Sequence, residues 1–206
     1  MTQTPHTGHP LTPARPRTNG REERLITPHP GLIVPGRDSD PAGRELDERI
    51  ALLQSLGITA GPDPEFDDLA SQLAAKTGFL YAMVNLFLAE QTFAGLHNPP
   101  PGSGHPIVLR TMSRAHGWCP EVVNRKKALP LPDVRASPRF ASNEVVDAIG
   151  IHSYFGTPLI HESGVVLGTV CAIDTQPRSL ADARRLLDIV KGTGDEVMGA
   201  IGARTP

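Results

Sequence analysis

Three stretches of the chain carry apolar residues at helical spacing, and shorter apolar runs lie between them. The first stretch begins near Pro41 and repeats at Leu46, Ile50 and Leu53 on one helical face. Gly57 follows this stretch and is a natural C-terminal cap. The spacing therefore predicts a helix that opens the folded part of the chain.

Local end signals mark the other two long helices. Asp63 is a good N-cap before Pro64, and Gly78 stands where this second helix is expected to end. The last helix is predicted to open at Ser179, with Asp182 three residues later in a pattern close to a capping box.

The apolar runs between these helices predict strands. Residues 79–88 are almost continuously apolar, as in a central strand buried on both faces, and residues 91–96 follow after a short turn. Residues 128–133 carry two prolines, which places this strand at a sheet edge. Residues 153–161 and 165–173 are joined by Glu-Ser-Gly, which predicts a hairpin.

The order of these elements indicates the fold class. Helices stand at both ends of the predicted domain, and the strands with one short helix lie between them. The last two strands form a hairpin, so the sheet is at least partly antiparallel. We therefore expect an α+β fold in which helices are layered on a sheet.

The first part of the chain has a different composition. Residues 1–43 hold eight of the 21 prolines and few clustered apolar residues, so they bury too little surface to offset their conformational entropy. We predict a disordered Pro-rich tail over residues 1–43 and one folded domain over residues 44–203.

Composition and charge narrow the classes of function. A net charge of −2 offers no basic face, so we expect no nucleic-acid partner. No stretch approaches the roughly 18 apolar residues of a membrane span, and the N-terminus lacks the apolar segment of a secretory signal. Two cysteines are too few for a disulfide scaffold, so a cytoplasmic protein with reduced thiols is expected.

Three segments resemble the GAF domain family. Residues 55–69 (SLGITAGPDPEFDDL) are similar to the family's opening, residues 131–143 (LPDVRASPRFASN) to its "DARADPRFADN" segment, and residues 154–174 (YFGTPLIHESGVVLGTVCAID) to its closing hairpin. Trp118-Cys119 stands where many members have "FC". The resemblance implies a GAF-like antiparallel sheet with terminal helices packed on one face and a ligand pocket on the other.

The resemblance also implies a class of function. GAF domains are sensors that bind nucleotides, tetrapyrroles, small metabolites or ions, and many of them pair through their terminal helices. We therefore expect a sensory or regulatory module that binds an unidentified small molecule, acts through a signalling partner protein and forms a homodimer. Two alternatives stay open: a dimerising interaction module without a ligand, and a thiol-dependent reductase of the GAF fold.

Cys119 is the first candidate for the site. A short helix is predicted to open there, with Pro120 in its first turn and Cys119 at the N-cap, where the helix dipole favours a thiolate. This makes Cys119 a candidate redox-sensitive residue, and the alternative is a small buried packing residue. Cys171 lies in an apolar run and is expected in the core.

Six further residues are candidates for ligand binding. Trp118 offers a flat apolar wall for a planar ligand. The resemblance puts Asp133, Arg139 and Tyr154 in segments on the pocket side, where Arg139 pairs with Asp133 or binds an anion. Phe140 is expected to plug into the core. A buried Asn85 either hydrogen-bonds core backbone or points into the pocket.

The sequence identifies no cofactor, no metal site and no catalytic residue. His97, His105, His116 and His152 lie around the middle of the chain, and His116 is three residues before Cys119, but paired zinc signatures are absent. The GAF-fold reductases of free methionine sulfoxide use several cysteines, whereas this chain has two.

Overall fold

The computed structural model describes residues 41–141 and 148–204. Residues 1–40 of the predicted tail lie outside this range. The first helix begins at Pro41, where the apolar spacing predicted it. The domain boundary at residue 44 stays a prediction.

The strands form one antiparallel sheet in the order β3-β2-β1-β6-β5-β4. Five of them occupy the segments where the sequence predicts strands, and the edge strand with its proline is confirmed. β3 was not predicted, because a two-residue strand leaves no periodic pattern. The bounds are β1 (Tyr81–Phe87), β2 (Gln91–His97), β3 (Thr111–Met112), β4 (Leu129–Leu131), β5 (Ser153–Ile160) and β6 (Val166–Asp174).

Three ends of the long helices α2 and α6 coincide with signals read from the sequence. Asp63 accepts hydrogen bonds from the first-turn amides of Glu65 and Phe66, Gly78 has a φ of 69°, and the Ser179 side chain accepts from the amide of Asp182. The helices are α1 (Pro41–Ser55), α2 (Pro64–Thr77), α3 (Cys119–Arg125), α4 (Pro138–Ala141) and α6 (Leu180–Ala203), with a 3-10 turn, η2 (Val134–Ala136).

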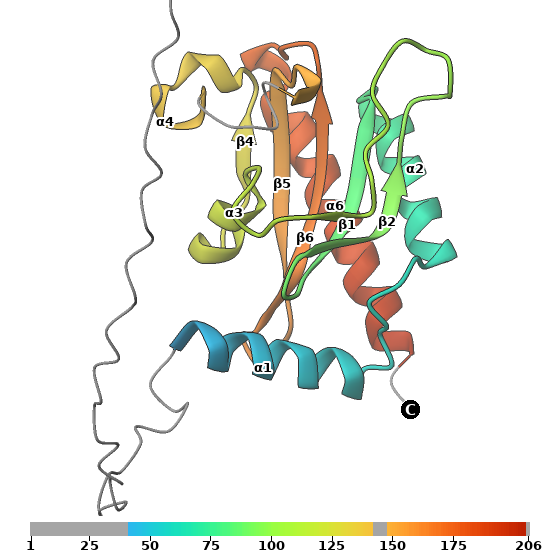
Figure 1. Ribbon diagram of the computed structural model, residues 1–206. Coiled ribbons are helices and arrows are strands. Elements are labelled where there is room, and N and C mark those ends of the chain that lie inside the picture. The colour runs from blue at the N-terminus through green and yellow to red at the C-terminus, as the bar shows by residue number, and fades with distance from the viewer. Residues whose placement is uncertain (1–40, 142–147, 205–206) are drawn as a thin grey trace, which may run out of the picture. The chain divides into compact units, whose positions relative to one another are not determined.

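One side of the sheet is covered by α2 and α6, and we call it the helix face. Figure 1 shows α6 behind the sheet and α1 across its lower end. Alternate residues of β1, namely Ala82, Val84 and Leu86, point into this layer. They pack there with apolar residues of α1, α2 and α6. The expected α+β arrangement is confirmed.

The other side of the sheet carries a second core, and we call it the cavity face. Tyr81, Met83 and Phe87 alternate with the helix-face residues along β1 and pack against Trp118 and the apolar side of α3. In Figure 1 the chain that leads into α3 crosses the front of the sheet. The sequence predicted a pocket on this side, and the fold leaves space there.

Arg49 joins α1 to the end of the sheet. Its side chain is fully buried and donates hydrogen bonds to the carbonyls of Phe87, at 3.0 Å, and Val166. Its third nitrogen lies 2.7 Å from the carboxylate of Glu45. Burial lowers the pKa of this guanidinium from its ordinary value, but each of its three nitrogens has a hydrogen-bond partner, so the ion is tolerated.

Among the described residues, no helix is both long and apolar enough to cross a membrane.

Candidate functional site

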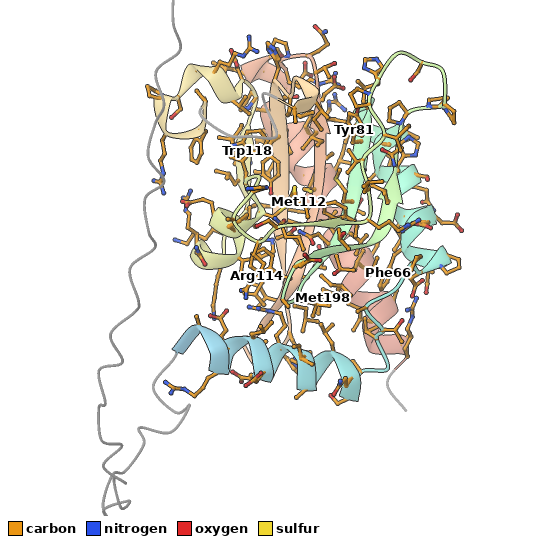
Figure 2. All side chains as sticks on the ribbon, viewed as in Figure 1. Phe66, Tyr81, Met112, Arg114, Trp118 and Met198 are labelled. Atoms are coloured by element: carbon orange, nitrogen blue, oxygen red, sulfur yellow. The ribbon has the colours of Figure 1, made fainter. Side chains whose placement is uncertain are left out.

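A cavity of about 200 Å³ opens on the cavity face of the sheet. Figure 2 shows Trp118, Met112 and Tyr81 around this front part of the sheet, in a view where α6 lies behind it. Strands, loops and a helix all contribute residues, and none of them is an aspartate, glutamate, lysine, arginine or histidine. They are Met83, Phe93, Val108, Met112, Gly117, Trp118, Cys119, Ala148, Ile149, Tyr154, Cys171 and Ile173.

Two aromatic rings form part of the wall. The ring centroids of Trp118 and Tyr154 are 5.3 Å apart and the planes are tilted by 46°. The Trp118 indole nitrogen donates to the carbonyl of Phe140 at 3.3 Å, which fixes the ring. Tyr154 lies over Gly156, where a Cβ would overlap the tyrosine hydroxyl. The glycine therefore makes room for the aromatic wall.

The two cysteines meet at the cavity. Their Sγ atoms are 3.8 Å apart, and Cys171 Sγ is also 3.8 Å from Met83 Sδ. Both cysteines are buried, as expected for Cys171 in a core strand. The predicted cap is wrong by one residue: Trp118 is the N-cap of α3, its side chain makes no capping hydrogen bond, and Cys119 is the first helical residue.

The hydrogen bonds around Cys119 favour its thiolate. The neighbouring Cys171 thiol lowers the pKa of Cys119 to about 6, helped by donors from Thr169, Tyr154 and Asn85 and opposed by burial. The same contact and burial raise the pKa of Cys171 well above its ordinary value. The hydroxyl of Tyr154 donates to Cys119 Sγ at 3.5 Å. The pair thus favours one thiolate held by one thiol.

Asn85 lies beneath the cavity and not in its wall. Its Nδ2 donates to Gln91 Oε1 at 2.9 Å, and Gln91 in turn donates to the carbonyls of Ser113 and His116, both at 2.8 Å. Asn85 thus bonds to side chains instead of core backbone. This buried amide relay ties the centre of the sheet to the loop before α3.

Asn85 also carries a hydrogen-bond acceptor that is not satisfied. Its Oδ1 is buried and has no hydrogen-bond partner among the described residues. Its amide is one of the donors that favour a thiolate at Cys119. The residue therefore acts on the site from below, through hydrogen bonds.

The remaining candidates lie outside the cavity. Asp133 caps η2 by accepting from the amide of Arg135 at 2.9 Å. The predicted pair with Arg139 is wrong, because Arg139 is exposed and binds Glu121 at 2.6 Å. Phe140 is only partly buried and packs at the border of the second core. Arg139 and Phe140 line a separate hollow beside α3.

The structure gives no support to a histidine-based metal site. Within the described ranges, no three histidine, cysteine, aspartate or glutamate side chains gather closely enough to hold an ion. His97 Nδ1 lies 3.2 Å from the Ser71 hydroxyl, and burial lowers the pKa of this histidine.

Sequence reasoning missed several residues of the wall. Met83, Phe93, Met112 and Ile173 line the cavity, yet each reads as an ordinary apolar residue in the sequence. The available signal was strand alternation: once Asn85 is placed on the pocket side of β1, Met83 must share its face.

Comparison with solved structures places this fold among GAF domains. The GAF domain of an Acinetobacter phosphoenolpyruvate-protein phosphotransferase is 15% identical, with a TM-score of 0.53, covering 78% of this chain and 93% of that one. The phycocyanobilin-bound GAF domain of a cyanobacterial phytochrome is 13% identical, with a TM-score of 0.56 and coverages of 81% and 96%.

An enzyme shares the fold as well. A type II free methionine-R-sulfoxide reductase from Thermoplasma acidophilum is 9% identical, with a TM-score of 0.51, covering 66% of this chain and 89% of that one. At such identities the likeness shows the fold alone. No curated protein matches the chain.

The family model of the GAF domain matches residues 62–201, which include every strand of the sheet and all the residues that line the cavity. The chain belongs to the GAF domain family.

Proposed function

We propose that this protein is a sensory or regulatory module whose cavity binds a small, neutral, planar molecule. The mainly apolar wall carries the proposal, because it holds no lysine, arginine or histidine. An anion bound there would lose its hydration without gaining a positively charged partner, and it would lie near Cys119, whose thiolate is favoured. The rings of Trp118 and Tyr154 match a flat ligand, and the volume of about 200 Å³ favours one smaller than a tetrapyrrole.

The test compares two ligands that differ in charge. p-Cresol and 4-methylbenzoate have similar shapes, and both can be followed by calorimetry and by the emission of Trp118, the one tryptophan of the chain. We expect saturable binding of p-cresol and at least about tenfold weaker binding of the carboxylate. Equal affinities, or emission that never saturates, would contradict the proposal.

A matched pair of variants ties binding to the cavity. Ile173→Phe adds volume to the wall and should abolish p-cresol binding. Ile189→Phe makes the same exchange at a half-buried position on the helix face and should leave binding unchanged. The same loss in both variants would mean that the effect is not local.

Redox regulation of Cys119 is a second candidate, favoured by the 3.8 Å contact between the two sulfurs. Hydrogen peroxide would convert the Cys119 thiol to a sulfenic acid with release of water, and Cys171 would then displace a second water to form a disulfide. Intact-mass measurement should show the loss of two hydrogens, reversed by dithiothreitol. If the folded wild-type protein keeps both thiols in the presence of hydrogen peroxide, redox regulation through a disulfide is excluded.

The output of the module remains a prediction from the sequence. A signalling partner protein and a homodimer through the terminal helices are proposed here. Leu52 of α1 and Leu187 of α6 are half-buried against the domain's own core. Sedimentation at high micromolar concentration tests the dimer, and a monomer there would exclude it.

A further inference from the structure

Most of the sulfur in this protein gathers around one cavity. The chain has two cysteines and four methionines. Four of these six side chains line the same cavity, namely Met83, Met112, Cys119 and Cys171. They come from β1, β3, α3 and β6, so the fold, and not sequence proximity, brings them together.

Two sulfur–sulfur contacts link three of these side chains, and we call them the sulfur cluster: Met83 Sδ, Cys171 Sγ and Cys119 Sγ. Cys171 is the middle member, 3.8 Å from each of the other two. Met83 and Cys171 are direct partners in the register of β1 and β6, so the sheet itself fixes their spacing. Sulfurs 3.8 Å apart can both lie about 2.3 Å from one ion, the length of a metal–thiolate bond.

The ligand types select the ion. Thiolate and thioether sulfur are soft ligands that favour Cu(I) over harder cations, whose usual ligands are carboxylate and carbonyl oxygens. No carboxylate or imidazole is among the residues that line the cavity. A three-sulfur site also lacks the four ligands that zinc takes in structural sites.

Polar groups next to the cluster fit a bound cation–thiolate unit. The Tyr154 hydroxyl donates to Cys119 Sγ at 3.5 Å and so orients one ligand. The Asn85 amide and the Thr169 hydroxyl lie beneath the cavity and are bonded to each other at 3.5 Å. These neutral donors offset negative charge on sulfur in an otherwise apolar wall.

We propose that Cys119, Cys171 and Met83 form a binding site for a single Cu(I) ion on the wall of the cavity. A cysteine that is still a thiol releases its proton to solvent when it coordinates the ion, so binding by the thiolate–thiol pair releases one proton. The site goes beyond the proposed organic ligand and does not depend on it.

The test is an anaerobic titration of the reduced full chain with Cu(I) presented as its bicinchoninate complex. We expect the protein to withdraw one equivalent of copper, read as loss of the coloured complex and gain of copper–thiolate luminescence. Cys119→Ser and Cys171→Ser should each lose this uptake. Wild-type protein that takes up no copper while folded and reduced would overturn the site.

Because a serine in the core can impair folding, a milder pair of variants decides the role of Met83. Met83→Leu conserves volume and should weaken Cu(I) binding at least about tenfold by removing one ligand. Met198→Leu, on α6 against the other core, should bind copper as the wild type does. Equal binding by both variants would overturn the three-sulfur site.

The outcome is separable from that of the proposed function. The copper titration uses no organic ligand, so a protein that binds p-cresol but no copper would overturn only the metal site. A protein that binds copper but no p-cresol would overturn only the organic ligand.

Discussion

The two faces of the sheet are built from the same strands but have different contents. Along β1, the helix-face residues Ala82, Val84 and Leu86 are small or aliphatic, while the cavity-face positions include Met83 and Asn85. On β6 the same contrast separates Ala172 from Cys171. Because side chains alternate along a strand, one sheet has a packed apolar core on one side and sulfur and polar side chains on the other.

The contrast extends to packing. On the helix face, the rings of Phe79 and Phe155 meet edge to face with centroids 5.6 Å apart, and Gly194 of α6 lies close against Thr157. On the cavity face, the wall around Trp118 leaves about 200 Å³ unfilled. Stability and binding are thus divided between the two sides, and substitutions should separate them.

The largest expected effect is on the helix face. Phe155→Ala should lower the free energy of unfolding by about 3–5 kcal/mol, since it opens a void in a close-packed core. Phe93→Ala in the cavity wall should cost at least about 1 kcal/mol less, because that ring already lacks neighbours on one side. Equal losses in chemical denaturation would mean that the two faces are equally well packed.

Substitutions of Arg49 measure how much its buried hydrogen bonds stabilise the end of the helix face. Arg49→Met should cost about 2–4 kcal/mol, because the buried carbonyls of Phe87 and Val166 lose a charged donor. Arg49→Lys keeps a charge but cannot reach both carbonyls and Glu45 together, so its loss should be intermediate. A methionine variant as stable as the wild type would show that the buried ion contributes nothing net.

Two glycine-to-alanine variants should have opposite signs. Gly156→Ala on β5 should cost about 1–3 kcal/mol and weaken ligand binding, because the new methyl group displaces the Tyr154 hydroxyl. Gly192→Ala in α6 meets open space and should stabilise the protein by about 0.5–1 kcal/mol. Denaturation curves of both variants, with p-cresol titrations, measure the difference.

The elements were predictable because their signals are local. Asp63, Gly78 and Ser179 lie at the helix ends where the sequence put them, since a cap depends on residues within one turn. The apolar run of β1 identified a central strand for the same reason. β3 was not predicted, because its two residues form a strand only through pairing with β2 and leave no local pattern in the sequence.

The site was predictable only in part, because it is assembled over long sequence distances. Trp118, Cys119 and Tyr154 were identified and do line the cavity, whereas Arg139 points to solvent and pairs with Glu121. Cys119 and Cys171 are 52 residues apart, so no pattern of spacing in the sequence predicts their contact. Surface ion pairs and cross-strand sulfur contacts depend on tertiary geometry that one-dimensional patterns do not carry.

The smallest expected effect concerns the N-terminus of α2 on the helix face. Hydrogen bonding to Arg204 is the main cause that lowers the pKa of Asp63 below its ordinary value of 3.8. A lowered pKa stabilises the folded state above the unfolded value, and this stabilisation is lost as the pH falls through the folded value. Wild-type stability should therefore fall more steeply below pH ~4 than that of Asp63→Asn, which keeps the cap but not the charge.

The difference should be under about 1 kcal/mol, since the pair is partly exposed and screened by solvent. Urea titrations of both proteins from neutral pH downward measure it, with Asp182→Asn at the cap of α6 as a matched control. Asp182 lies near the exposed Arg185, at 3.6 Å, so this variant should follow the wild type more closely. Parallel curves for wild type and Asp63→Asn would show that the contact with Arg204 adds nothing to the stability of the helix face.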